Sequence, residues 1–225
     1  MTAPGPGRLR YKDLCLDAVR PEVMAGFWGP ALGLRSDSRG NDVMLVDGVD
    51  EHTLWIHRVP EVATVKQRVH LDLHVGSVQD LVDLGAEVVD DTLPWTVLRD
   101  PEGGELCAFV RPAERLPRHR LYELVVDAED PERLAAWWGA VLGVDSRGFS
   151  WLSGVPGMPW EMVFNPVPEP KRVKNRIHWH LQGRTEDAVA AGARLLRPAG
   201  DDIGWDVLAD PDGNEFCVFS PAGYS

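Results

Sequence analysis

The chain has 225 residues, enough for one large domain or two ordinary ones, and either would bury a core without disulfides or a structural metal. Its formal net charge of −12 argues against nucleic acid or an anionic membrane as a partner, because phosphate binding needs clustered lysine and arginine. The three cysteines are widely spaced, odd in number and free of any CxxC motif, which favours a reduced, cytoplasmic protein over a secreted one.

Two segments bear on targeting. Met1–Arg10 is rich in proline and glycine and lacks the apolar centre of a signal peptide. The longest nearly continuous apolar run, Leu134–Val144, is too short to span a bilayer. We therefore expect no membrane partner.

The first predicted elements are a strand and a helix. Short apolar alternation over Tyr11–Ala18 predicts the strand. Pro21 suits the first turn of the helix, and Gly33 marks its end. Two more strands are predicted over Asp42–Asp47 and Thr53–Pro60. On the helix, the residues predicted to form the buried face recur every four positions: Val23, Phe27 and Ala31.

A second unit begins at Val69–Val75, which is predicted to be a strand with two unlike faces. Neighbouring side chains of a strand point to opposite faces, so His70, Asp72 and His74 share one face and the apolar residues share the other. A helix over Val78–Leu84 and further strands up to residue 110 are predicted to follow.

Three sequence blocks then recur in the same order and at nearly constant spacing. The block LCLDAVRPEVMAGFWGPALGL from Leu14 recurs as LVVDAEDPERLAAWWGAVLGV, VKQRVHLDL from Val65 recurs as VKNRIHWHL, and WTVLRDPEGGELCAF from Trp95 recurs as WDVLADPDGNEFCVF. The chain is therefore an internal duplication, with predicted domains at 1–110 and 121–225 joined by a connector at 111–120. The second copy is predicted to have helices at Pro131–Leu142 and about Thr185–Leu195.

The histidine-rich strand face recurs as well. His178, His180 and Gln182 share one face of the second copy's strand, opposite apolar neighbours. Such a face lies against either solvent or a polar-lined pocket. Because histidine stands at the equivalent positions 70 and 178, we favour a pocket.

These blocks resemble the vicinal oxygen chelate superfamily, and within it the glyoxalase-like domain shared with bleomycin-resistance proteins and dioxygenases. The motifs that carry the resemblance are LDAxxPExxAxFWxxxLG at Leu16–Gly33, KxRxHLDL at Lys66–Leu73 and DPEGxExC at Asp100–Cys107, each with a counterpart in the second copy. The resemblance implies an α+β fold of tandem glyoxalase-like domains, each made of paired βαβββ modules that curl into a cavity-forming mixed sheet. It implies no single reaction, because the superfamily contains isomerases, dioxygenases, thiol transferases and drug-sequestering proteins.

In metal-using members of the superfamily, four ligands come from the first and last strands of the two modules. Carried over by position, the first domain offers Asp13, His57, His70 and Cys107, and the second offers Glu123, Asn165, His178 and Cys217. Metal-using members have glutamate where the two cysteines stand. We therefore predict that the protein uses no metal, with a divalent ion at Asp13, His57 and His70 as the alternative.

Other conspicuous residues have simpler explanations. The motifs that begin at Asp100 and Asp210 are predicted to be β-turns, since proline and glycine supply the dihedral angles of a turn. Asp17 and Asp127 are predicted to cap helices or anchor loops. We expect Arg68 and Arg176 to pair with carboxylates, with an anionic ligand as the alternative. The repeated tryptophans 28, 95, 138 and 205 are predicted to be core, whereas some of tryptophans 55, 151, 160 and 179 are candidates to line a pocket.

Two functions remain open at this point. The first is binding of a small organic molecule in a sheet-lined cavity without a metal, by a monomer or homodimer. The second is a metal-dependent lyase, isomerase or dioxygenase that uses the N-terminal site, with His57 or His70 as the catalytic base. A third, more modest hypothesis is that one domain has lost its site, in which case the N-terminal domain is the active one. The residues predicted to contact the ligand are Asp13, Asp72, Cys107, Glu123, Asn165, His178, His180 and Cys217.

Overall fold

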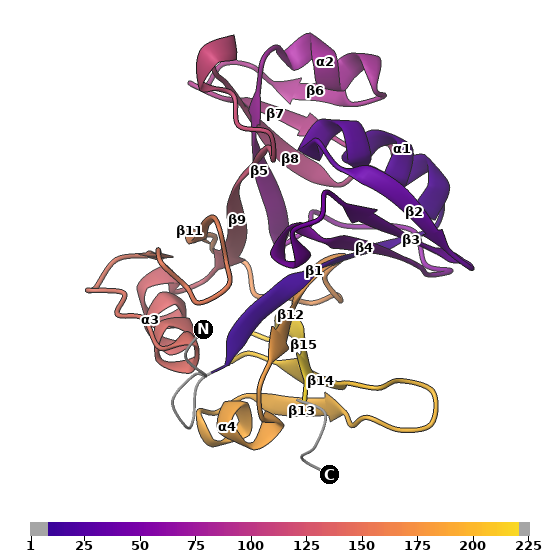
Figure 1. The fold of residues 1–225 in the computed structure, drawn as a ribbon. Coiled ribbons are helices and arrows are strands. Elements are labelled where there is room, and N and C mark those ends of the chain that lie inside the picture. The colour runs from indigo at the N-terminus through magenta and orange to yellow at the C-terminus, as the bar shows by residue number, and fades with distance from the viewer. Residues whose placement is uncertain (1–8, 221–225) are drawn as a thin grey trace.

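The computed structural model describes residues 9–220 (Figure 1). The prediction made for Met1–Arg10 falls almost entirely outside this range. The first half of the chain contains β1 (Arg10–Ala18), α1 (Pro21–Leu32), β2 (Arg35–Arg39), β3 (Asp42–Val46), β4 (Leu54–Arg58), β5 (Val69–Val75), α2 (Val78–Asp83), β6 (Glu87–Asp90), β7 (Thr96–Arg99) and β8 (Glu105–Val110), with a short 3₁₀ helix, η1, at Asp50–His52.

The second half repeats most of this order. After the 3₁₀ helix η2 (Ala113–Arg115) it contains β9 (Leu121–Ala128), α3 (Pro131–Leu142), β10 (Trp151–Leu152), β11 (Glu161–Pro166), β12 (Ile177–Gln182), α4 (Thr185–Ala190), β13 (Arg194–Arg197), β14 (Asp206–Ala209) and β15 (Glu215–Phe219). Both long helices begin at a proline and end before a glycine with a φ of 75°, Gly33 and Gly143. The predicted starts and ends of α1 and α3 are confirmed.

The strands form two mixed sheets, which confirms the predicted α+β class. One sheet has eight strands in the order β13-β14-β15-β12-β1-β4-β3-β2, and the other has seven in the order β10-β11-β9-β5-β8-β7-β6. Each sheet therefore combines one module from each repeat. The junctions are two antiparallel pairs, β1 with β12 and β5 with β9, which lie side by side in the middle of Figure 1.

This exchange of modules decides how the paired modules combine, which the resemblance leaves open. The first module of repeat one shares its sheet with the second module of repeat two, and the reverse holds for the other sheet. No sheet is built from one repeat alone. The boundaries proposed at 110 and 121 therefore stay a division of the sequence, because the strands on either side of them are interleaved.

Ion pairs from the KxR motif clasp the two repeats at each junction. Lys66 Nζ lies 3.1 Å from a carboxylate oxygen of Asp127, and Lys174 pairs in the same way with Asp17. The two aspartates therefore anchor the partner repeat. They do not cap the helices that follow them, whose N-cap residues lie further along the chain.

The arginines of the same motif bind backbone rather than carboxylates. Arg68 donates to the carbonyl of Glu169, and Arg176 donates to the carbonyl of Glu61. The predicted pairing of these arginines with carboxylates is therefore wrong. Their guanidinium groups bind the connecting loops of the opposite repeat, which again links one copy to the other.

Two local predictions need correction, and one strand was missed. Val23 of α1 is 42% exposed whereas Met24 is 1% exposed, because the buried stripe of a helix advances by three or four residues and not by strict fours. Helix α4 ends at Ala190, before Gly192 with its φ of 106°, and the expected last turn belongs to β13. Strand β2, with the polar sequence RSDSR, was not predicted.

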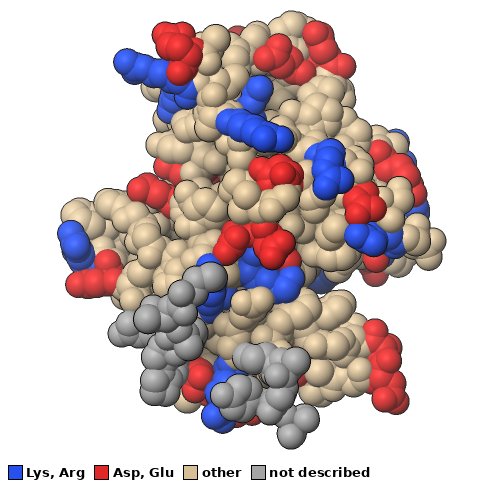
Figure 2. Space-filling model, in the orientation of Figure 1, with Lys and Arg blue, Asp and Glu red and all other residues tan. Residues whose placement is uncertain are grey.

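The charged groups are mixed over the visible surface. On the face drawn in Figure 2, lysine and arginine are interspersed with aspartate and glutamate. Within residues 9–220, no helix has the length and apolar character needed to cross a bilayer.

Candidate functional site

Each sheet packs one face against helices and carries its polar side chains on the other. The polar face of the eight-stranded sheet, here face A, comprises Asp13, Cys15, Asp17, Trp55, His57, His178, His180, Cys217 and Phe219. The polar face of the seven-stranded sheet, face B, comprises His70, Asp72, Cys107, Phe109, Glu123, Asp127, Glu161 and Asn165. Both faces draw residues from both repeats.

A buried acid–base pair joins the repeats at the centre of face A. Oδ1 of Asp13 lies 2.5 Å from Nδ1 of His180, and Asp13 also pairs with Lys12. Burial on its own would raise the pKa of Asp13. The hydrogen bond and charge of His180, followed by those of Lys12, outweigh burial and hold this pKa below its usual value. The carboxylate therefore accepts the Nδ1–H of His180 and leaves Nε2 available.

Two imidazole nitrogens on face A are buried without a partner. Nε2 of His180 and Nδ1 of His178 form no hydrogen bond with any described residue. The two side chains are 2% and 7% exposed. Burial, and then the neighbouring His180, lower the pKa of His178 well below its ordinary value, so this ring is neutral. Each of these two nitrogens is thus free to bond to a group that the described residues do not supply.

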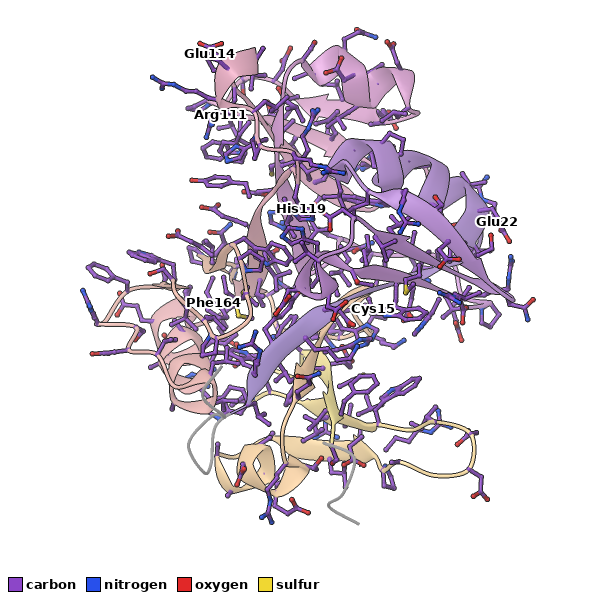
Figure 3. All side chains as sticks on the ribbon, in the orientation of Figure 1. Cys15, Glu22, Arg111, Glu114, His119 and Phe164 are labelled. Atoms are coloured by element: carbon purple, nitrogen blue, oxygen red, sulfur yellow. The ribbon has the colours of Figure 1, made fainter. Side chains whose placement is uncertain are left out.

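A thiol lies beside these rings. Sγ of Cys15, on β1 near the middle of the molecule in Figure 3, is 3.3 Å from Nδ1 of His57. Burial raises the pKa of Cys15 well above its ordinary value and lowers that of His57. The pair is therefore a neutral thiol beside a neutral imidazole, which argues against Cys15 as a nucleophile.

A β-bulge selects the side chain that reaches each face. The pairing register shifts at Lys12 in the first repeat and at Tyr122 in the second. On face A the bulge places the Lys12 ammonium 4.8 Å from the centre of the Phe219 ring. On face B it places Tyr122 in a stack with His74, with ring centroids 4.3 Å apart. Because bulges redirect side chains, equivalent positions here present different chemistry.

Aromatic rings surround the imidazoles of face A. The ring of Trp205 lies 5.2 Å from that of Phe219 and 6.4 Å from that of His57, and the Trp55 ring lies 5.9 Å from His57. A pocket of about 360 Å³ opens beside this group. Its volume is within the range of small-molecule sites. The pocket is lined by Arg10, Tyr11, Lys12, Asp13, Met44, Asp50, Glu51, Thr53, Trp55 and Gln182.

Face B has three carboxyl groups abreast at its centre. Glu161 stands opposite Glu123 between β11 and β9, and Glu123 stands opposite Asp72 between β9 and β5. Burial, and then the charge of Glu123, raise the pKa of Asp72 to about 8. Burial lowers the pKa of the adjacent His70 to about 4. At neutral pH Asp72 is therefore protonated and His70 is neutral.

The model of the glyoxalase-like domain matches the chain twice, over residues 13–109 and 123–219. The chain belongs to the glyoxalase-like domain family.

Solved structures show the same fold along nearly the whole of this glyoxalase-like protein. Glyoxalase I from Zea mays is 12% identical with a TM-score of 0.63, and the match covers 94% of this chain and 92% of that chain. A putative dioxygenase from Bacillus subtilis is 10% identical with a TM-score of 0.61, with 95% and 85% covered. The cppA protein of Streptococcus pneumoniae is 10% identical with a TM-score of 0.52, with 95% and 97% covered. Identities this low establish the fold alone. No curated protein matches the chain.

A divalent metal, which the family resemblance implies for some members, fits the donors of face A. Cys15, His178 and His180 offer donor atoms that all lie within 4.8 Å of one another. Two of the three contribute the unpartnered nitrogens described above. One sulfur and two imidazoles suit a borderline ion such as zinc. A second overlapping group is Cys15, Asp17 and His57, and face B has His70, Asp72 and Cys107.

The structure regroups the predicted site residues. Asp13, His57, His178, His180 and Cys217 lie on face A, whereas His70, Asp72, Cys107, Glu123 and Asn165 lie on face B. The alternative N-terminal metal set is therefore wrong as a unit, because His70 lies in the other sheet from Asp13 and His57. Each face takes strands from both repeats, and the hypothesis that the N-terminal domain is the active one stays a prediction. A role for each residue in binding or catalysis stays a prediction.

Cys15 was missed as a candidate. It lies between Asp13 and Asp17 on the same strand face, so alternation along β1 would have found it. Lys12 was missed for another reason. The bulge that brings it to face A depends on the pairing with β12, and no local sequence signal predicts that pairing.

Half of the prediction for the repeated tryptophans is confirmed. Trp28 and Trp138 are fully buried in the core. Trp95 and Trp205 are instead partly exposed and stack on the phenylalanines of β8 and β15. Of the other four, Trp55 lines the face A pocket and Trp179 is core.

The turn prediction is confirmed at both positions. Oδ1 of Asp100 accepts the backbone N–H groups of Glu102 and Gly104 between β7 and β8. Asp210 does the same between β14 and β15. These aspartates are fully engaged in shaping hairpins and offer no acid–base pair.

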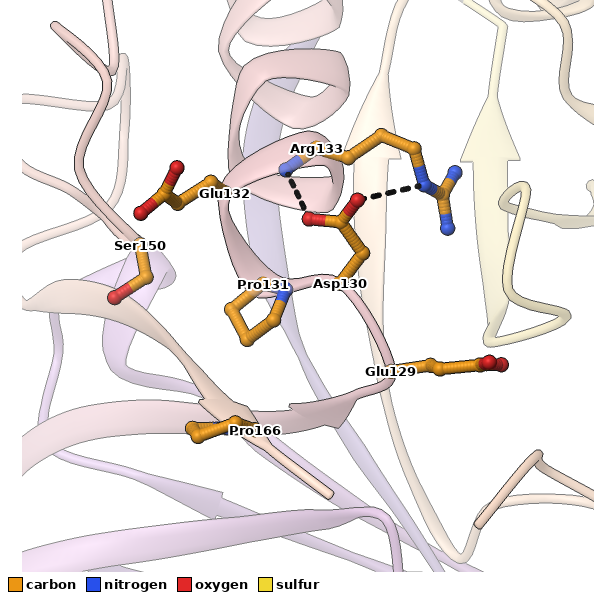
Figure 4. A pocket seen from close by; sticks show the side chains of 7 residues that line it. All are labelled: Glu129, Asp130, Pro131, Glu132, Arg133, Ser150 and Pro166. Atoms are coloured by element: carbon orange, nitrogen blue, oxygen red, sulfur yellow. Dashed lines mark hydrogen bonds and ion pairs between the residues drawn. The ribbon is translucent and has the colours of Figure 1, made fainter. Parts of the chain in front are cut away.

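Another depression, larger than the face A pocket, lies at the start of α3. It has a volume of about 740 Å³ and surrounds the start of α3 (Figure 4). There Asp130 accepts the backbone N–H of Arg133 and lies 3.8 Å from its guanidinium. This is a capped helix end whose polar groups bind one another, and we place no function there. It is lined by Glu129, Asp130, Pro131, Glu132, Arg133, Ser150 and Pro166.

The proton on Asp72 makes stability depend on pH. Because the pKa rises from 3.8 to about 8 on folding, this group stabilises the fold fully below about pH 4 and loses that contribution as pH rises towards 8. Asp72→Asn keeps the shape and cannot ionise. Relative to the natural protein, the variant should gain on the order of 2 kcal/mol between pH 6 and pH 8. Urea unfolding at both pH values measures the difference, and an equal difference at the two values would contradict the assignment.

Proposed function

We propose that this glyoxalase-like protein binds a small organic molecule on face A, and that His180 accepts a hydrogen bond or a proton from it. The observation that carries the proposal is Nε2 of His180, buried and without a partner among residues 9–220 while Asp13 holds Nδ1. An imidazole fixed at one nitrogen by a carboxylate offers the other nitrogen as a base.

The surroundings favour a planar, partly apolar molecule. Trp55 and Met44 line the pocket, and Trp205 stacks on Phe219 over the imidazoles. Flat aromatic walls favour flat ligands, since stacking adds to the burial of apolar area. Asp13 lines the pocket and contacts His180, so it connects the ligand space to the proposed base.

A library of fluorinated aromatic fragments tests this proposal. Fluorine NMR of the fragments detects binding, and the indole N–H signals of the protein show where each fragment binds. Fragments that shift the indole signals of Trp55 and Trp205 should bind at least about tenfold more weakly to His180→Gln, because one hydrogen bond to a buried base is lost. The matched control is His70→Gln on face B, which should leave their affinity unchanged. Equal binding to His180→Gln and the natural protein would overturn the role of His180.

A second candidate function is metal-dependent chemistry of the lyase, isomerase or dioxygenase type. It is favoured by the clustering of Cys15, His178 and His180 within 4.8 Å. A divalent ion bound there would polarise a carbonyl group of the ligand. Nδ1 of His57 lies 3.3 Å from Sγ of Cys15 and is placed to take the thiol proton when the sulfur becomes a ligand.

Cobalt titration separates the two candidates. If the cluster binds metal, Co²⁺ should produce a thiolate charge-transfer absorption that Cys15→Ser abolishes and Cys107→Ser on face B leaves intact. Absence of that band, together with fragment binding that depends on His180, would support the metal-free function.

A further inference from the structure

The carboxyl groups of face B stand opposite one another, whereas the corresponding carboxyl group of face A stands opposite a histidine. Glu161, Glu123 and Asp72 stand directly opposite one another across three adjacent strands. Asp72 carries a proton at neutral pH, so the like charges that remain opposite each other are those of Glu161 and Glu123. Like charges in this relation destabilise a sheet. At the equivalent place on face A, Asp13 stands opposite His180, and the two form a hydrogen bond. Face B thus has carboxyl groups opposite one another where face A has a carboxylate opposite a histidine.

The nearest lysine of face B is engaged elsewhere, and two buried groups point into the row. Lys66 lies 3.1 Å from Asp127 and 3.8 Å from Glu105. His70 is 8% exposed, and its Nε2 lies 3.5 Å from Oδ1 of Asp72, which is 6% exposed. Neither Nδ1 of His70 nor Oδ1 of Asp72 forms a hydrogen bond within the described part of the chain. The row therefore contains two buried polar atoms without a hydrogen-bond partner, which is unusual in a folded protein.

An aromatic shelf flanks the same row. The rings of Trp95 and Phe109 are stacked 5.6 Å apart, and Tyr122 meets Phe109 edge-on at 5.3 Å. All three are partly exposed. The guanidinium of Arg111, labelled in Figure 3, lies 5.7 Å from the centres of both Phe109 and Tyr122. The shelf therefore already attracts a cation from the chain itself.

We propose that face B is a second binding site, independent of face A, and that it takes an organic ammonium ion. The carboxyl row accepts charge-assisted hydrogen bonds from the ammonium group, and the shelf stacks against the organic part. This combination favours an aromatic or alkyl amine over a bare metal ion, because a metal ion would use the donor atoms and leave the rings without a role. Arg111 is the internal competitor for the same place.

NMR titration of the full-length, isotope-labelled protein with three related probes tests the proposal. Benzylammonium should shift the Trp95 indole signal and the backbone signals of face B with a dissociation constant on the order of 1 mM, as expected for a fragment. Benzyl alcohol and benzoate have the same ring with no charge or the opposite charge. Each should bind at least about tenfold more weakly.

Three substitutions give opposite expected signs. Glu123→Gln should weaken benzylammonium binding about fivefold or more, and Arg111→Gln should strengthen it about threefold because a competing cation is removed. Glu22→Gln changes the net charge equally. Glu22 lies on the outer side of α1, away from face B (Figure 3), so this substitution should have no effect. Tyr122→Leu leaves every carboxyl in place and should still weaken binding through the shelf.

Several results would overturn the proposal. Benzyl alcohol binding as tightly as benzylammonium would remove the need for charge, and equal weakening by Glu22→Gln and Glu123→Gln would reduce the effect to general attraction. Zinc shifting the signals of His70 and Asp72 while benzylammonium shifts none would assign the row to a metal. His180→Gln should leave the benzylammonium titration unchanged, so face B can fail or succeed separately from face A.

Discussion

Neither repeat is expected to be stable as a monomer when the chain is divided between residues 116 and 117. The antiparallel pairs β1–β12 and β5–β9 hold the two sheets together, and each contains one strand from each half. A separated half would expose two long strand edges and the apolar faces beside them, which promotes self-association. Either half alone should aggregate or form a homodimer, and the two halves mixed in equal amounts should form a stable one-to-one complex. Light scattering coupled to size exclusion measures this outcome.

A protease site inserted in the connector provides the control. Cleavage after folding cuts the chain near η2 without removing any strand pair, so the nicked protein should stay together and keep its unfolding midpoint. A monomeric half that unfolds cooperatively at the midpoint of the whole protein would contradict the exchange of modules between repeats.

Trp138→Ala is expected to cost about 4 kcal/mol of unfolding free energy, the usual range for truncating a fully buried tryptophan. The Trp138 ring centroid lies 5.0 Å from those of both Trp179 and Phe216, and its Nε1–H donates to Asp210 at 3.1 Å. The substitution therefore opens a cavity between α3 and the eight-stranded sheet, and it also removes the donor that bonds to the buried carboxylate of Asp210. Urea unfolding monitored by circular dichroism gives the value.

Two comparison variants separate packing from hydrogen bonding. Trp138→Phe keeps most of the ring and should cost about 1–2 kcal/mol through the lost donor to Asp210. Trp151→Ala truncates a tryptophan that is 38% exposed and should cost less than about 1 kcal/mol. A cost for Trp138→Ala no greater than that for Trp151→Ala would show that the α3 contact contributes little.

The order of elements and the separation of polar from apolar faces were predictable from local sequence. Pro21 and Gly33 bound α1 because their dihedral preferences act within a few residues. Alternation from Val69 placed His70 and Asp72 on one face because the period of a strand is two. In the structure both side chains are nearly buried.

The assembly of the faces was not predictable in the same way. Alternation states which side chains of β5 share a face but does not state which strand lies next to β5. Strand β5 of the first repeat and strand β12 of the second carry the same KxRxH motif. Strand β1 could therefore pair with either of them and still satisfy the alternation of polar and apolar residues. His180 rather than Asp72 therefore stands opposite Asp13, and only coordinates reveal it. The bulges at Lys12 and Tyr122 follow from that pairing and were hidden with it.

The pairing between repeats decides which residues must be compatible with each other. A substitution at Asp13 alters the surroundings of His180, which lies in the other repeat. It does not alter those of Asp72, the residue of its own repeat that is equivalent to His180. Two successive copies of the first repeat would set Asp13 against Asp72 on both faces, and two of the second would set Glu123 against His180. The unlike chemistry of the two faces therefore needs both repeats, because each face takes one strand of its central pair from each of them.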